Sequence, residues 1–173
     1  FSPRQPTIRT KPWPRALLAV GDVGELREGE ESFDALVAQG PDALDPAPTA
    51  PDDIAIWKFT TGSTGMPKAC VHRAETPLRS FEHYARDVLD IRENDLVLPV
   101  PKLFFGYARD LAALYPFGVG AAGIVFPERS TPEKVFELVA RHRPTILVNV
   151  PTMIRAMLEQ PEHDLSCLRL CTS

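Results

Sequence analysis

A run of hydroxyl, glycine and lysine residues at 60–68 has the composition of a phosphate-binding loop. Gly62 and Gly65 lie three residues apart, so that backbone N–H groups can turn toward an anion. Lys68 adds a mobile positive charge that suits the outer phosphates of a nucleotide. Hydroxyls that can donate to phosphate oxygens belong to Thr60, Thr61, Ser63 and Thr64. The run fits neither the Walker pattern nor the dinucleotide fingerprint, and it predicts either a phosphate site or a plain polar turn.

The three cysteines, Cys70, Cys167 and Cys171, fit no zinc-binding spacing, and we expect no metal at these residues. An odd count without a close pair is not typical of a disulfide framework. It favours a reducing compartment, and we therefore predict a cytoplasmic protein with structural cysteines.

The composition excludes several classes of protein. Of 173 residues, 44% are apolar and 24% are charged, which is ordinary for a globular chain. The formal net charge of −4 argues against a nucleic-acid partner. No run approaches the roughly 20 apolar residues of a membrane span, so we expect no membrane role. The composition leaves open whether the protein forms a homodimer. Because the chain starts at Phe1, we expect a piece of a longer protein.

Apolar periodicity from residue 54 onward predicts strands that alternate with helices. The expected strands cover 54–59, 96–100, 122–126, 145–150 and 168–171. The expected helices begin at the Thr-Pro pairs 76–77 and 131–132 and also cover 107–115 and 152–160. This order predicts an α/β fold with an open, mostly parallel sheet flanked by helices. The run at 60–68 would then follow the first strand, at the sheet edge where such folds bind ligands.

Two domains follow from the same patterns. Residues 1–53 form a proline-rich, acidic N-terminal segment, in which we expect a short strand at 17–20 and a helix capped by Ser32. Residues 54–173 form the α/β portion.

The string TTGSTGMPKA, which begins at Thr60, closely resembles the signature loop of the AMP-forming adenylate synthetases. That superfamily includes acyl- and aryl-CoA ligases and peptide-synthetase adenylation domains. The segment Lys102–Tyr107, KLFFGY, resembles the KLFFAYG segment of benzoate–CoA-ligase-type enzymes, with Gly106 where alanine is common. The resemblance covers about residues 54–173.

The resemblance implies part of the large N-terminal domain of an acid–thiol ligase that uses ATP, Mg²⁺ and coenzyme A. In such enzymes a carboxylic acid attacks the α-phosphate of ATP, and the thiol of CoA then attacks the acyl-adenylate. The resemblance gives Lys68 a catalytic role. It assigns the ATP phosphates to Thr60, Thr61, Gly62, Ser63, Thr64, Gly65 and Lys68.

The resemblance also places Lys102, Phe105, Gly106 and Tyr107 at the pocket for the carboxylic acid. An aromatic wall beside a glycine favours a flat ring or a somewhat larger acid. The aromatic residues could instead be core residues at a helix start. Lys102 could attract a carboxylate or could be a cation at a strand end.

Two alternative functions stay open: an adenylation domain that loads a carrier protein, and a non-catalytic nucleotide-binding module. We expect the chain alone to be inactive, because the sequence stops before the family's adenine-contacting segment and its C-terminal domain.

Overall fold

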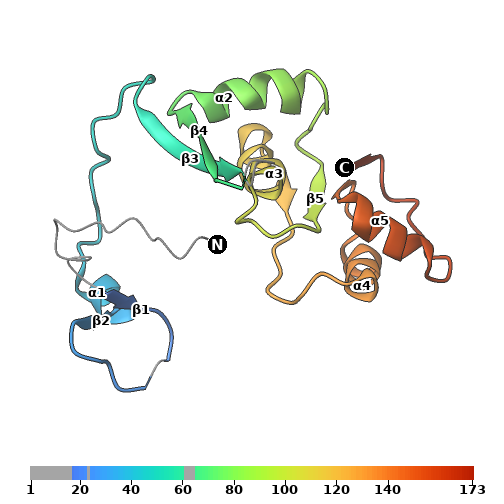
Figure 1. Cartoon of the computed structure of the whole chain (residues 1–173). Helices are drawn as coiled ribbons and strands as arrows, with labels where there is room; N and C mark the ends of the chain where they lie inside the picture. The colour runs from blue at the N-terminus through green and yellow to red at the C-terminus, as the bar shows by residue number, and fades with distance from the viewer. Residues whose placement is uncertain (1–16, 23, 61–64) are drawn as a thin grey trace. The chain divides into compact units, whose positions relative to one another are not determined.

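The computed structural model describes residues 17–22, 24–60 and 65–173 (Figure 1). These residues fall into two compact units, one ending at Pro48 and the other beginning at Thr49. Within the described ranges, none of the helices combines the length and the apolar character needed to cross a bilayer.

The described residues of the first unit form two short strands and one helix. β1 (Leu17–Ala19) pairs in parallel with β2 (Glu30–Ser32). α1 (Phe33–Gln39) begins after Ser32, whose side-chain oxygen accepts a hydrogen bond of 3.2 Å from the backbone N–H of Ala35. The expected strand and the expected Ser32 cap are both confirmed.

A parallel sheet forms the centre of the second unit. Its strands are β5 (Leu96–Pro99), β6 (Ala122–Gly123), β7 (Ile146–Val148) and β8 (Leu170–Thr172). They stand in the order β6-β5-β7-β8, and every neighbouring pair is parallel. The predicted α/β class with an open, mostly parallel sheet is confirmed.

Helices cover both faces of this sheet. Alternate residues of β5 point to opposite sides, so Val97 lies in one buried cluster and Leu98 in the other. The cluster around Leu98 contains buried residues of α4 and α5, and Figure 1 shows both helices on the same side of β5. The helical segments are α2 (Thr76–Ser80), η1 (Phe81–Arg86), α3 (Gly106–Arg109), η2 (Asp110–Leu114), η3 (Pro116–Val119), α4 (Pro132–His142) and α5 (Pro151–Leu158).

One helix start is as expected and another differs. Thr131 caps α4, with its hydroxyl accepting from the N–H of Lys134 at 3.3 Å. Thr76, expected to cap the first helix, is instead its first residue, and Glu75 precedes it at the cap position. The Thr76 hydroxyl accepts from the N–H of Arg73, because the chain arrives from a strand that needs its last donor satisfied.

The strand expected at 54–59 is present, but its predicted place in the parallel sheet is wrong. β3 (Ile54–Thr60) pairs antiparallel with β4 (Lys68–Arg73), and the two form a separate two-stranded sheet. The sequence prediction missed β4, because it placed no strand or helix between the candidate phosphate loop and the Thr-Pro pair at 76–77. Because the two strands are antiparallel, the candidate phosphate loop connects the strands of a hairpin.

Candidate functional site

The β3–β4 hairpin places two of the predicted phosphate-binding residues opposite each other. Thr60, the last residue of β3, pairs directly with Lys68, the first residue of β4. Residues that pair across an antiparallel ladder lie on the same face, and so do residues two apart along a strand. Lys58 therefore shares this face with Thr60 and Lys68.

The middle of the predicted loop lies outside the described residues. Thr61, Gly62, Ser63 and Thr64 belong to this part, and their phosphate role stays a prediction. Gly65 is described, and its positive φ of 77° favours glycine at this point before β4.

An ion pair joins the hairpin to the helix at Gly106. The Nζ of Lys58 lies 3.0 Å from Oδ2 of Asp110, the first residue of η2. Arg109 contacts the other carboxylate oxygen of Asp110, with Nη2 at 2.6 Å and Nε at 2.9 Å. The side chains of Lys58 and Asp110 are 32% and 20% exposed, so the pair is largely shielded from water. Figure 1 shows the hairpin beside α2 and α3.

Gly106 contacts the side chain of Lys58. A Cβ atom built on Gly106 would lie 2.8 Å from Nζ and 2.9 Å from Cε of Lys58. The space that a side chain would fill at position 106 is therefore occupied by the lysine. Contact between Gly106 and a carboxylic acid stays a prediction.

Tyr107 is held at the carboxyl-terminal edge of the parallel sheet. Its hydroxyl donates a 2.7 Å hydrogen bond to Oγ1 of Thr172, the last residue of β8. Burial raises the pKa of Tyr107, although the bond to Thr172 opposes that shift. The phenol therefore stays protonated at neutral pH and acts as a donor. Its ring packs against the core cluster that contains Val97 and Leu111.

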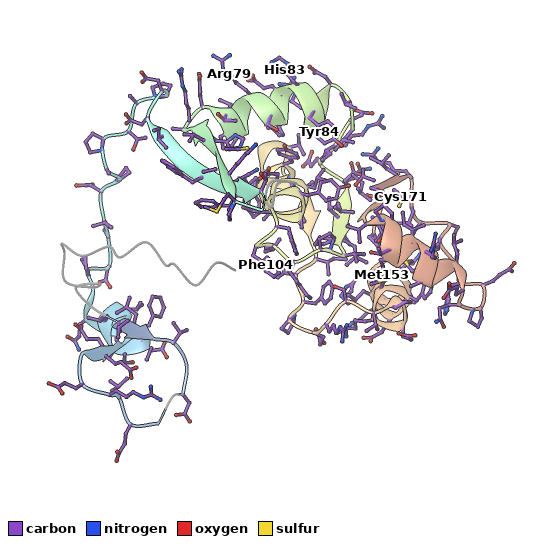
Figure 2. All side chains as sticks on the ribbon, in the orientation of Figure 1. Arg79, His83, Tyr84, Phe104, Met153 and Cys171 are labelled. Carbon is purple, nitrogen blue, oxygen red and sulfur yellow. The ribbon has the colours of Figure 1, made fainter. Side chains whose placement is uncertain are left out.

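The two phenylalanines before Gly106 are exposed and are not core residues. Phe104 is 81% exposed and Phe105 is 55% exposed, with their ring centroids 4.4 Å apart. Figure 2 labels Phe104 in the segment between β5 and α3. Phe105 immediately precedes α3 and is available to a ligand near Tyr107.

Lys102 contacts the segment that follows β6. Its ammonium donates to the backbone carbonyls of Phe126, at 3.0 Å, and Glu128, at 2.5 Å. It also lies 3.6 Å from the centroid of the Phe126 ring. These contacts give Lys102 a structural role, and its contact with a carboxylic acid stays a prediction.

Metal-ligating side chains do not gather in the described ranges. Across residues 17–22, 24–60 and 65–173, no group of three or more His, Cys, Asp or Glu side chains is arranged to hold a metal ion. The three cysteines are free thiols, and burial raises the pKa of Cys171.

Sequence reasoning missed Lys58, Asp110 and Thr172 as members of this site. Lys58 did carry a signal, because it is the one charged residue of β3. The signal indicates that the lysine needs a polar partner, but not which acid supplies it.

The AMP-binding enzyme family model matches residues 8–173. The chain belongs to this family.

Several similar proteins are aryl–CoA ligases. A benzoate–CoA ligase from Thauera aromatica is 44% identical over 149 residues, which are 84% of this chain and 28% of that protein. A 4-hydroxybenzoate–CoA/benzoate–CoA ligase from Rhodopseudomonas palustris is 37% identical over 163 residues, covering 92% of this chain and 30% of the relative. The chain therefore spans less than a third of the length of each of these relatives.

The fold is similar to that of solved aryl–CoA ligases. The anthranilate CoA ligase AuaEII, crystallised with anthranoyl-AMP, superposes with a TM-score of 0.80 at 30% identity. The match covers 91% of this chain and 31% of that structure.

Proposed function

We propose that this chain is part of an ATP-dependent, AMP-forming acid–thiol ligase that activates an aromatic carboxylic acid and transfers it to coenzyme A. The observation that carries the proposal is the direct pairing of Thr60 with Lys68 at the two ends of the signature sequence. This pairing brings together the two ends of a glycine- and hydroxyl-rich loop. Lys68 lies on the same face of the hairpin as Lys58, whose ion pair with Asp110 joins that face to the segment following α3. The aryl–CoA ligases among the relatives support the same reaction class.

In the first step a carboxylate oxygen of the acid attacks the α-phosphorus of ATP. The bond from that phosphorus to the bridging oxygen breaks, its electron pair leaves with pyrophosphate, and an acyl-adenylate remains. Lys68 stabilises the negative charge on the β- and γ-phosphates as they depart, together with N–H and hydroxyl donors of residues 60–65. Mg²⁺ enters as part of the MgATP substrate.

In the second step the thiol of coenzyme A gives up its proton to solvent and its sulfur attacks the acyl carbon. The carbon–oxygen bond to the phosphate breaks, and AMP leaves with the electron pair. The segment with Phe105, Gly106 and Tyr107 would contact the acyl group, with Lys102 at its start. A flat aromatic acid suits this segment, because the exposed Phe105 ring and the fixed Tyr107 ring offer planar apolar surfaces.

Binding of ATP to the protein that contains this chain and to its Lys68→Ala variant tests the nucleotide site. A charged hydrogen bond contributes about 1.5–3 kcal/mol, so we expect the ATP dissociation constant to rise by at least about tenfold. Lys134→Ala is the matched control, because Lys134 lies on α4 and pairs with Glu128 and Glu137. Binding that survives Lys68→Ala unchanged would contradict the ligase proposal and favour a non-catalytic nucleotide-binding module.

A benzoate-dependent exchange of labelled pyrophosphate into ATP tests the first chemical step on the protein that contains this chain. Product analysis with coenzyme A and with a carrier protein then identifies the acceptor. A thioester formed only on the carrier protein would contradict the second step and favour a carrier-loading adenylation domain.

A further inference from the structure

We propose that Lys58 is a positioning residue: its ion pair with Asp110, made across Gly106, fixes the phosphate-binding hairpin relative to the helix that carries Tyr107. We call Lys58, Gly106 and Asp110 the hairpin clamp. The proposal rests on the proposed function for its effect on ATP, but its structural part can be tested without that function.

Both carboxylate oxygens of Asp110 accept hydrogen bonds from basic side chains. Oδ2 of Asp110 accepts a hydrogen bond from Nζ of Lys58 at 3.0 Å, and Oδ1 accepts one from Nη2 of Arg109 at 2.6 Å. Each carboxylate oxygen therefore contacts a different cation. Lys58 is separated from Asp110 by 52 positions in the sequence, while Arg109 is the neighbouring residue. The pair with Lys58 is therefore the part of this network that joins two distant elements.

The absence of a side chain at Gly106 leaves the space that the Lys58 side chain occupies. A methyl group at position 106 would come within 3 Å of two atoms of the lysine side chain, at 2.8 Å from Nζ and 2.9 Å from Cε. Those atoms belong to the flexible end of the side chain, so any larger residue would push the ammonium away from Asp110. The glycine thus leaves room for the ion pair and does not by itself enlarge the pocket for the acid.

The clamp lies close to both candidate sites. Lys58 precedes Thr60 by two residues on the same face, which is about 7 Å along a strand, and Lys68 lies opposite Thr60. At its other end, Asp110 follows α3, which starts with Gly106 and Tyr107. A shift at Lys58 would therefore change the distance between the phosphate residues and the aromatic segment.

The hairpin depends on this face for its position. An isolated two-stranded hairpin is only marginally stable in water. On the opposite face, the described part of the chain leaves large apolar side chains uncovered, with Trp57 58% and Phe59 70% exposed. The face with Lys58 therefore supplies the contacts that hold β3 and β4 against the helices.

The test combines amide hydrogen exchange with ATP binding on the protein that contains this chain. Lys58→Met, Asp110→Asn and Gly106→Ala each remove the ion pair in a different way, and Lys134→Met removes an unrelated lysine pair on α4 as the control. We expect faster exchange in peptides covering 54–73 for the three clamp variants and unchanged exchange for Lys134→Met. A misplaced binding group can cost one to two orders of magnitude, so we expect the ATP dissociation constant to rise about tenfold.

Two further variants separate positioning from general stability. Lys58→Arg keeps the positive charge and should restore most of the ATP affinity. The double variant Gly106→Ala with Lys58→Met should bind ATP no more weakly than Lys58→Met alone, because both changes break the same contact. Clamp variants that unfold at lower temperature but bind ATP as the wild type does would overturn the positioning role.

ATP binding and hydrogen exchange together distinguish failure of the proposed function from failure of the clamp. If the protein that contains this chain binds no ATP, the nucleotide proposal fails and hydrogen exchange alone decides the clamp. Faster exchange at 54–73 in Lys58→Met would then support the structural clamp, and exchange equal to the wild type would overturn it.

Discussion

The carboxylate of Asp95 connects three neighbouring strands at their amino-terminal ends, and its replacement by asparagine tests how the sheet is stabilised. Asp95 immediately precedes β5, and its side chain is 3% exposed. Its Oδ1 accepts from the hydroxyl of Thr145, just before β7, at 2.6 Å and from Nε of Arg169, just before β8, at 2.8 Å. The backbone N–H of Arg92 donates to Oδ2 at 2.8 Å. Asp95→Asn removes the charge but keeps the size of the side chain.

The pKa of Asp95 gives the size of the expected effect. Burial raises this pKa, but hydrogen bonds from Arg169, Thr145 and the Arg92 backbone outweigh burial and lower it from 3.8 to about 2. Each pKa unit is worth about 1.4 kcal/mol, so the ionised carboxylate stabilises the fold by about 2.5 kcal/mol at neutral pH. Arg169 is 34% exposed, so water can solvate it in the variant, and we expect a loss near this value.

The pH dependence of this stabilisation has a definite sign. The folded-state pKa lies below the unfolded value, so the contribution is complete above about pH 5 and is lost as the pH falls toward 2. At pH 3 about half of it, roughly 1.3 kcal/mol, should remain.

Urea denaturation of the wild type and of Asp95→Asn at pH 7 and pH 3 measures both quantities. Asp87→Asn is the control, because its carboxylate is 66% exposed and lies 3.6 Å from Nδ1 of His83, which is itself exposed. We expect the control to change stability by less than about 0.5 kcal/mol. A difference below about 1 kcal/mol at pH 7 for Asp95→Asn, or an equal difference at pH 7 and pH 3, would refute this account.

Three further substitutions test single contacts by urea denaturation. Gly123→Ala should destabilise the second unit by about 3 kcal/mol or more, because the new Cβ would lie 2.0 Å from the carbonyl oxygen of Ala112; a stable variant would show that β6 can move. Thr131→Ala should cost about 1 kcal/mol through loss of the α4 cap, and Thr131→Ser should cost much less. Tyr107→Phe should cost about 1 kcal/mol, since it removes the donor to Thr172, and a neutral result would mean that this bond does not hold Tyr107.

Local patterns in the sequence predicted the parts of the fold that depend on neighbouring residues. The start of α4 follows from Thr131 and Pro132, a capping hydroxyl followed by a residue that favours the first helical turn. The strands of the parallel sheet follow from short apolar runs that must be covered on both faces. These features need no information about which distant residues meet.

The hairpin shows where local patterns fail. Lys68–Arg73 mixes charged and apolar residues, and the sequence prediction assigned no strand to it. Its strand conformation is fixed by pairing with Ile54–Thr60, through a register that places Lys68 opposite Thr60. Strand propensity depends strongly on such partners, so β4 could be recognised only after the return of the chain had been inferred.

The charge networks around Asp95 and Asp110 depend on the topology in the same way. Asp95 meets Arg169 because parallel strands β5, β7 and β8 begin at one edge of the sheet, and the two residues are 74 positions apart. Lys58 meets Asp110 because the hairpin packs on the helix that follows β5. The sequence holds 23 acidic residues, and nothing in their spacing identifies Asp95 and Asp110 as the partners of these basic residues. The signature at 60–68 identifies the chemistry, whereas the lysine two residues before it indicates how that chemistry is held in place.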